Sequence, residues 1–264
     1  MDYIKDKVIV ITGAGSGICQ ATAELLAKQG AKLVIGDLNY ENACNVADAI
    51  TENGGIAKPF AIDVSKSEDA FALAEFAVKE FGDLDVLVNG AGIMPRGQFN
   101  IQKLEKWLAA VDVNFKGVIN CTYAAIQKML EKEDGKIRQI VSISSTSASN
   151  WKPAQGIYCA TKHSVKWLMD SLRREYPGKI KFSTVYPSGV LDTNINTSFG
   201  IQTGDPLEGT KDPFGRQNDF NYDKNMDCLF KANLADVISY VIAQPQGIVI
   251  TDLMVRASGE LPIS

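Results

Sequence analysis

Short runs of apolar, often β-branched residues alternate along the chain with longer stretches in which apolar residues recur every three or four positions. The short runs are typical of strands that are buried on both faces, and the longer pattern is typical of amphipathic helices. Glycines and prolines separate many of these segments, as expected at turns. The predicted strands span residues 8–12, 32–36, 57–62, 86–89, 138–142, 181–186 and 247–254, and the predicted helices span residues 18–29, 41–53, 67–81, 102–114, 115–131, 157–176 and 235–242.

The order of these elements predicts the fold class. Strands that alternate with helices of this length form parallel βαβ units, which wind on both faces of one sheet. We therefore predict an α/β protein with a Rossmann-like, doubly wound parallel sheet of about seven strands. No repeat, low-complexity tract or linker interrupts the sequence, so we expect residues 1–264 to form a single domain. Weak periodicity between residues 193 and 233 predicts a lid over the substrate.

Composition and charge argue against several classes of protein. The 264 residues carry a net charge of −4 and no cluster of Lys and Arg, so we expect neither nucleic acid nor an anionic membrane as a partner. The polar start is unlike a signal peptide, and no apolar run approaches the length of a membrane span. Five scattered cysteines and one histidine match neither a disulfide framework nor a metal site. We expect a cytoplasmic protein without a bound metal.

The residues that follow the predicted strands carry the candidate chemistry, because ligands of parallel α/β sheets bind beyond the carboxyl ends of the strands. Gly13, Ser16, Gly17 and Ile18 form a glycine-rich turn that leads from the first strand into a helix. The free amides at such a helix start suit a pyrophosphate. Asp37 closes the second strand, where a carboxylate can accept hydrogen bonds from an adenosine ribose.

Asp37 also favours NAD(H) over NADP(H). A 2′-phosphate at this place would face a like charge, at a cost of roughly 1–4 kcal/mol. The neighbouring loop positions, Ser16 and Leu38, supply no Arg or Lys that would attract the phosphate. The other interpretation is that Asp37 only caps the turn that follows it.

Tyr158 and Lys162 lie four positions apart in a predicted helix, so their side chains share one face. A tyrosine titrates near pH ~10, and a neighbouring cation favours its charged form. For the phenol to lose its proton near neutral pH, its pKa must fall by roughly three units. We therefore expect Lys162 to favour the phenolate of Tyr158, which could then exchange a proton with an alcohol or ketone. Most Tyr and Lys pairs at this spacing are surface residues, so the pair needs further support.

Further motifs follow the other strands: Asp63-Val64, Asn89-x-Ala91-Gly92, Asn114, Ser145 (thirteen residues before Tyr158) and Pro187-x-Gly189. Together with Thr12-Gly13-x-x-x-Gly17-Ile18 and Tyr158-x-x-x-Lys162, in this order and spacing, they resemble the short-chain dehydrogenase/reductase family over nearly the whole chain. The resemblance implies an oxidoreductase that uses a nicotinamide cofactor. It also implies a homo-oligomer, a dimer or a tetramer.

The resemblance implies roles for individual residues. Tyr158 would be the general acid or base, Lys162 would hold the nicotinamide ribose, Ser145 would bind the substrate oxygen, and Asn114 would anchor a water in the proton relay. Three places depart from the family pattern. Cys19 replaces a glycine, Gly90 stands where an asparagine is frequent, and residues 255–259 lack the paired glycines that are usual there, which argues against the common tetramer packing. A thiol at a helix start can have a lowered pKa and be sensitive to oxidation; the other interpretation of Cys19 is packing. The residues expected around the cofactor are Gly13, Ser16, Gly17, Ile18, Asp37, Leu38, Asp63, Val64, Asn89, Ala91, Gly92, Tyr158, Lys162, Pro187, Val190 and Thr193.

The leading functional hypothesis is hydride transfer between NAD(H) and a secondary alcohol or ketone, as in an alcohol dehydrogenase or carbonyl reductase. The alternatives are a non-catalytic NAD-binding sensor or scaffold, and a reductase of 3-oxoacyl thioesters. Aromatic residues between 193 and 233 are candidates for substrate contacts, unless they only pack the lid onto the body. We expect Met94, Trp151 and Tyr186 to line the same pocket. We expect Arg96 to face solvent, and the alternative is that Arg96 reads an anionic substrate.

Overall fold

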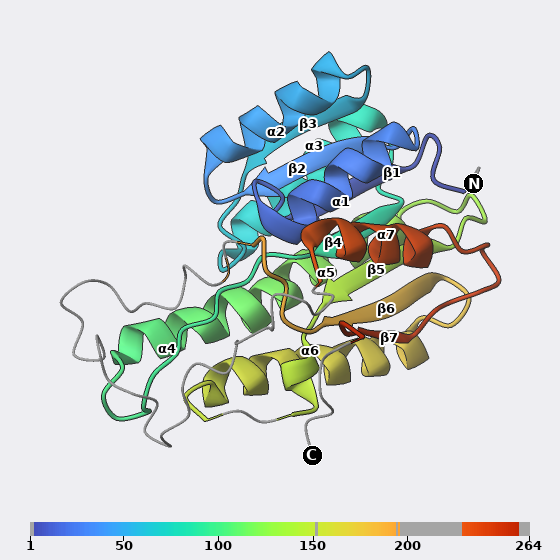
Figure 1. Ribbon diagram of the computed structural model, residues 1–264. Coiled ribbons are helices and arrows are strands. Elements are labelled where there is room, and N and C mark those ends of the chain that lie inside the picture. The colour runs from blue at the N-terminus through green and yellow to red at the C-terminus, as the bar shows by residue number, and fades with distance from the viewer. Residues whose placement is uncertain (1–2, 151–152, 194, 196–228, 259–264) are drawn as a thin grey trace.

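The computed structural model describes residues 3–150, 153–193, 195 and 229–258 (Figure 1). Trp151 and most of the expected lid lie outside these residues. Seven parallel strands form one sheet in the order β3-β2-β1-β4-β5-β6-β7, which confirms the predicted fold class. The strands are β1 (Val8–Thr12), β2 (Lys32–Asp37), β3 (Ile56–Ala61), β4 (Val86–Asn89), β5 (Arg138–Ile143), β6 (Ile180–Pro187) and β7 (Asp252–Val255).

Helices cover both faces of the sheet (Figure 1). One face packs against α1, α2 and α7, and the other packs against α3, α5 and α6. The helices are α1 (Gly17–Lys28), α2 (Tyr40–Glu52), α3 (Ser67–Phe81), α4 (Leu104–Val111), α5 (Gly117–Leu130), α6 (Gly156–Glu175) and α7 (Lys231–Ile242). This arrangement explains the apolar runs of the strands, because a strand covered on both sides buries every side chain.

Alternate residues of β1 illustrate how the two layers are built. Ile9 and Ile11 belong to the core beneath α1, α2 and α7, whereas Val8 and Val10 belong to the core beneath α3, α5 and α6. All four side chains are almost completely buried. The alternation follows from the two-residue period of a strand.

The structure differs from the predicted elements at two places. The helices expected at residues 102–114 and 115–131 are joined by a π-helical turn, Asp112–Lys116, which connects α4 to α5 without a break. A π-helical turn of this kind is often found at a functional site, and it contains Asn114. The last strand is shorter than expected, because only Asp252–Val255 pairs with β6.

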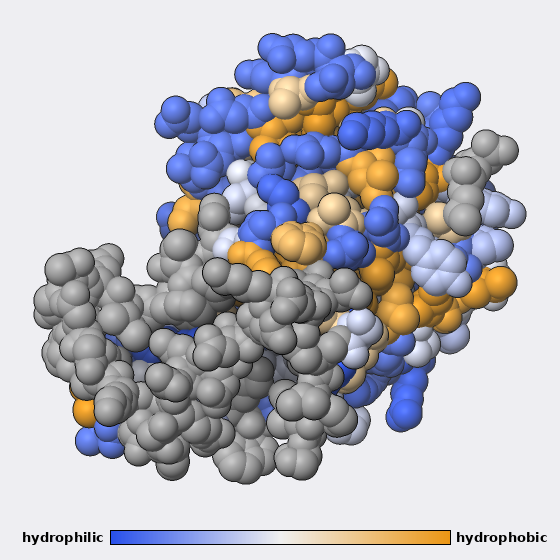
Figure 2. Space-filling view, viewed as in Figure 1, coloured by the Kyte–Doolittle hydropathy of each residue, from blue (hydrophilic) through white to orange (hydrophobic). Residues whose placement is uncertain are grey.

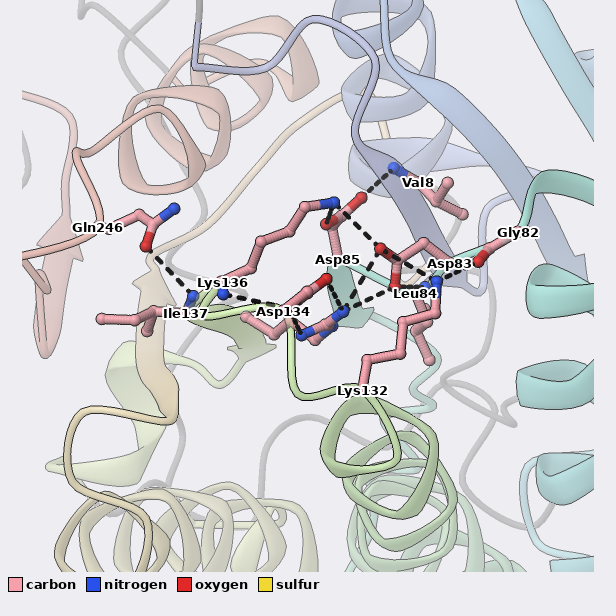
Figure 3. Close-up of polar contacts among 11 residues, drawn as sticks. Val8, Gly82, Asp83, Leu84, Asp85, Lys132, Asp134, Lys136, Ile137 and Gln246 are labelled. Carbon is pink, nitrogen blue, oxygen red and sulfur yellow. Dashed lines mark hydrogen bonds and ion pairs between the residues drawn. The ribbon is translucent and has the colours of Figure 1, made fainter.

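A network of ion pairs closes the amino end of the sheet (Figure 3). The buried Arg138, the first residue of β5, pairs with Asp83 at 3.0 Å and with Asp134 at 2.9 Å. Lys136 also pairs with Asp83, at 3.1 Å. The hydrogen bonds from Arg138 lower the pKa of Asp134 to about 2. These contacts join the loops before β4 and β5 and leave the carboxyl end of the sheet open for a ligand.

The outer surface carries the polar faces of the helices. In Figure 2, hydrophilic residues cover most of the surface over α1 and α2, and apolar residues show between them. Among the helices of the described residues, none is both long and apolar enough to cross a membrane.

Candidate active site

A cavity of about 650 Å³ lies at the carboxyl ends of the strands. The register brings these ends together: Thr12 pairs with Gly36, and Asn89 pairs with Ser142, so the loops that follow these strands reach one edge of the sheet. The cavity therefore lies at the edge of the sheet where the sequence predicts a ligand site. The predicted residues that line the cavity are Gly13, Ser16, Gly17, Ile18, Asp37, Leu38, Asp63, Val64, Ala91, Gly92, Ser145, Tyr158, Lys162, Pro187, Val190 and Thr193.

The side chain of Asn89 contacts other residues instead of the cavity. Its Nδ2 donates hydrogen bonds to Thr122 Oγ1 at 3.0 Å and to Ser142 Oγ at 3.2 Å. Asn89 is buried, and it connects β4 to α5 and β5. Its side chain therefore holds the end of β4 in place, and Asn89 is not among the described residues that line the cavity.

Asn114 also lies behind the cavity wall, and its amide is used to position the loop after β4. Nδ2 donates to Ile93 O at 2.8 Å, and Ile93 N donates to Oδ1 at 2.8 Å. Nδ2 also lies 3.3 Å from Thr161 Oγ1 on α6. Asn114 thus connects that loop to the helix that carries Tyr158. A water relay at Asn114 would have to use its main-chain carbonyl or the remaining acceptor capacity of Oδ1.

Ser145, Tyr158 and Lys162 meet where β5 ends and α6 begins. Lys162 Nζ donates to Ile143 O at 2.8 Å and lies 5.9 Å from the centre of the Tyr158 ring. Ser145 Oγ accepts a hydrogen bond from Ser147 N at 3.1 Å, so its own proton can be donated to another oxygen. Tyr158 and Lys162 are both buried. The cavity therefore contains a proton donor, a hydroxyl and a buried amine side by side.

Burial is the largest influence on the pKa values of Tyr158 and Lys162. It raises the pKa of Tyr158 to about 12, although the hydrogen bond from Ser145 and the charge of Arg96 oppose this rise. Burial also lowers the pKa of Lys162 to about 8. The expectation that Lys162 makes Tyr158 a phenolate near neutrality is therefore wrong, because the loss of solvation on burial outweighs the effects that lower the pKa of this phenol. The phenol retains its proton at neutral pH, which suits it to act as an acid.

The glycine-rich loop between β1 and α1 fits a dinucleotide in three respects. Gly13 and Gly17 adopt left-handed backbone angles, with φ of +70° and +59°, which glycine tolerates best. A Cβ at Gly13 would lie 2.8 Å from Ala91 Cα, so this loop packs directly against the loop after β4. Ser16 precedes α1 without capping it through its side chain, and the first turn of α1 contains no acidic residue. The positive end of the helix therefore remains available for a phosphate.

The contacts of Asp37 agree with both interpretations of this residue, as a cap for the turn that follows it and as a ligand for a ribose. Oδ1 accepts a hydrogen bond from Asn39 N at 2.9 Å, as a turn-capping residue would. Oδ2 accepts from Gly15 N at 2.8 Å and so connects the end of β2 to the glycine-rich loop. Asp37 nevertheless lines the cavity, and each carboxylate oxygen can accept a second hydrogen bond. This geometry fits a ribose diol beside Asp37.

Cys19 and Gly90, which both depart from the family pattern, are in direct contact. A Cβ at Gly90 would lie 2.0 Å from Cys19 Sγ, so the thiol fills the volume that a side chain at position 90 would need. Burial raises the pKa of Cys19 to about 12, even though Lys162 opposes the rise. The expectation of a lowered thiol pKa is therefore wrong, because Cys19 is buried against β4 rather than exposed at the helix start. The packing interpretation of Cys19 accounts for the geometry.

The substrate end of the cavity differs from the sequence-based expectation. Arg96 was expected to face solvent but is half-buried and lines the cavity, as Met94 does. Tyr186 was expected to line it, yet its hydroxyl binds Asp252 on β7, and this residue is absent from the described wall. Gln155 lines the cavity without having been predicted. The one sequence signal for Arg96 is its position in the loop after β4, because ligands bind at the ends of such strands.

Comparison with known proteins agrees with this geometry. The profile of the short chain dehydrogenase family matches residues 7–203. An uncharacterized oxidoreductase of Listeria monocytogenes is 32% identical over 97% of this chain and 98% of the relative. A second, from Staphylococcus aureus strain USA300, is 30% identical over 97% of this chain and 99% of the relative.

Solved structures share the fold over almost the full length. A 3-ketoacyl-(acyl-carrier-protein) reductase from Brucella melitensis, in complex with NADH, has a TM-score of 0.79 and 31% identity over 96% of this chain and 97% of that one. An alcohol dehydrogenase from Thermococcus sibiricus, in complex with 5-hydroxy-NADP, has a TM-score of 0.80 and 25% identity over 98% of this chain and 99% of that one. The chain therefore belongs to the short chain dehydrogenase family of oxidoreductases.

Proposed function

We propose that the protein transfers a hydride between NAD(H) and a secondary alcohol or ketone. The observation that carries this proposal is that one cavity contains Ser145, Tyr158 and Lys162 together with the glycine-rich loop and Asp37. A sensor or scaffold that only bound the cofactor would not need a buried phenol, a hydroxyl and an amine at the other end of the same cavity. The arrangement therefore supports turnover over binding alone.

The residues of the chain would supply position and proton transfer, and the bound cofactor would supply the hydride. In the direction of reduction, a carbonyl compound, NADH and one proton give an alcohol and NAD⁺. Tyr158 gives its phenolic proton to the carbonyl oxygen, and Ser145 donates a hydrogen bond to the same oxygen. Lys162 would hold the nicotinamide ribose. It lies next to Tyr158, where its charge would stabilise the phenolate left behind.

A second candidate is the reduction of 3-oxoacyl thioesters. It is favoured by the similarity to the Brucella melitensis reductase, whose identity to this chain exceeds that of the alcohol dehydrogenase. The chemistry at the carbonyl group is the same, so Ser145, Tyr158 and Lys162 would serve either substrate. The two candidates differ only in what surrounds the carbonyl group.

NADH oxidation with a panel of carbonyl compounds tests the function. The panel contains simple ketones, short oxo acids, their esters and an acetoacetyl thioester of N-acetylcysteamine. We expect at least one compound to be reduced, and the matching alcohol to be oxidised with NAD⁺. A protein that binds NADH but turns over no member of the panel in either direction would favour the non-catalytic alternative.

We expect NADH to bind more tightly than NADPH, by about tenfold or more, because Asp37 repels the 2′-phosphate. The charged side chains that line the described wall support this preference: the carboxylates are Asp37 and Asp63, and the cations, Arg96 and Lys162, lie on the loop after β4 and on α6. Fluorescence titration with each cofactor measures the ratio, and Asp37→Ser should lower it.

Asp48→Asn is the matched control, since it removes one carboxylate from the exposed side of α2, outside the cavity wall. The ratio should stay close to that of the unmodified protein. Tighter binding of NADPH by the unmodified protein, or an unchanged ratio in Asp37→Ser, would remove Asp37 from cofactor selection.

The affinity for NADH should fall as the pH rises through about 8. Lys162 is held at a pKa of about 8 by burial, and a cofactor hydrogen-bonded by its ammonium favours the protonated amine. Below this pH the amine is already charged, so binding takes up no proton. Above it binding must take up a proton, and the affinity falls by at most about tenfold per pH unit. Titrations between pH 6 and about 10 measure this, and Lys162→Met should bind weakly without the same decline. A constant affinity in the unmodified protein would contradict this role.

A further inference from the structure

Arg96 is held by its neighbours at the wall of the cavity. With the Gln155 amide oriented so that its oxygen faces Arg96, that oxygen accepts hydrogen bonds from Nε and Nη2, at 3.0 Å each. The main chain of this loop is tied down as well, since Gln102 Nε2 donates to Arg96 O at 2.7 Å and Gly97 N donates to Ala154 O at 3.0 Å. The guanidinium is therefore presented from a loop that several contacts fix.

The guanidinium lies at the reacting end of the cavity. Its positive charge opposes the rise that burial causes in the pKa of Tyr158, so it acts on the phenol of the same cavity. Burial lowers the pKa of Arg96 itself, which means that the group has lost part of its contact with water. A partly desolvated cation binds an anion more strongly than an exposed one does.

The charged residues of the described wall are separated along the cavity. Asp37 is the last residue of β2 and Asp63 follows β3, at one edge of the sheet. Arg96, by contrast, follows β4, and Lys162 lies on α6. Lys162 donates to Ile143 O, and the proposed function assigns its side chain to the nicotinamide ribose. Arg96 is the cation of this wall to which neither the proposed chemistry nor the cofactor assigns a task.

We propose that Arg96 binds a carboxylate on the substrate, and that the substrate is a short oxo acid or the corresponding hydroxy acid. This inference rests on the proposed oxidoreductase function of the same cavity. The planar guanidinium matches the geometry of a carboxylate and can donate two parallel hydrogen bonds to it. The carboxylate takes no part in the reaction: an oxo acid, NADH and one proton give a hydroxy acid and NAD⁺.

Matched pairs of acid and methyl ester test the charge requirement directly. The pairs are pyruvate, acetoacetate and 4-oxopentanoate with their methyl esters, because the keto carbon then lies one, two or three bonds from the carboxyl carbon. In the unmodified protein we expect kcat/KM to favour the acid by about 10- to 100-fold in at least one pair, as for a partly buried charge pair. The preference should arise mainly in KM, because the carboxylate is bound equally before and during the reaction.

Three variants assign the preference to Arg96. Arg96→Met should bring the acid-to-ester ratio of kcat/KM close to one, and Arg96→Lys should give an intermediate ratio, because a lysine keeps the charge but not the two parallel hydrogen bonds. Lys103→Met is the control for net charge, since Lys103 is exposed in the same segment and lies outside the described wall. Its ratio should match that of the unmodified protein.

Binding gives a readout that does not depend on turnover. Calorimetric titration of the protein and NAD⁺ with each hydroxy acid and its methyl ester should show tighter binding of the acid, and this difference should vanish in Arg96→Met. Equal or tighter binding of the ester in the unmodified protein overturns the proposal, as does an acid preference that survives in Arg96→Met. If the esters, simple ketones or the thioester are reduced well and the acids are not, the proposed function stands and the carboxylate assignment fails. If acids bind through Arg96 but no panel compound is turned over, the proposed function fails and the binding site stands.

Discussion

Replacing Tyr158 with phenylalanine is expected to lower kcat for carbonyl reduction by about 10²–10⁴-fold, the usual contribution of a positioned proton donor. The phenyl ring fills the same buried space, so the fold and the affinity for NADH should change little. The pKa of about 12 means that the phenol carries its proton throughout the neutral range, so the loss should be similar at every pH from about 6 to 9.

Steady-state reduction of the best panel compound, together with NADH titration, measures both expectations. Tyr176→Phe is the matched control, since Tyr176 lies at the other end of α6 and packs against Phe182, away from the cavity. That variant should retain the activity of the unmodified protein. Equal activity in Tyr158→Phe would remove the phenol from the mechanism.

The second large effect concerns the contact between Gly90 and Cys19. Gly90→Ala is expected to lower the free energy of unfolding by about 3 kcal/mol, because its Cβ would lie 2.0 Å from Cys19 Sγ and 2.9 Å from Thr12 O. Thr12 O is a main-chain atom and the Cys19 thiol is buried, so neither neighbour has free space into which it could move. The end of β4 would therefore have to shift, and with it the cofactor loop.

Chemical denaturation of single and double variants separates this clash from a general sensitivity to alanine. In a Cys19→Gly background, Gly90→Ala should cost at least about 1 kcal/mol less than it does in the unmodified protein, because the two sites are in contact. Gly247→Ala is the control, since a Cβ there meets nothing within 4 Å. Additive effects of the two substitutions would mean that the thiol does not determine the residue at position 90.

The periodicity of the sequence was sufficient to predict the fold because the strands are buried on both faces. Buried strands such as β1 and β5 carry continuous apolar runs, and Gly30 and Gly82 mark the ends of the helices that follow β1 and β3. The last strand was predicted too long, since residues 247–251 are apolar in part but do not pair with β6. Pairing at a sheet edge depends on the neighbouring strand and leaves little trace in local pattern.

The site was predictable where its residues follow strands. It was less predictable where contacts between distant segments determine the burial or the pKa of a side chain. Asp37 and Ser145 lie at strand ends, so their convergence followed from the topology. The half-buried Arg96 contacts Gln155, which is far away in sequence, so the local pattern gave only its place in a loop after a strand. The proton affinity of Tyr158 likewise depends on how completely the fold buries it, and spacing to Lys162 alone gave the wrong sign.

Transfer of deuterium from labelled NADH to the product tests the central claim most directly. The panel compound with the highest rate is reduced with NADH that carries deuterium at both C4 positions, and the product alcohol is analysed by mass spectrometry and NMR. The account predicts one deuterium on the carbinol carbon of each product molecule, and the loss of this product in Tyr158→Phe. Product without deuterium at that carbon would contradict direct hydride transfer in this cavity.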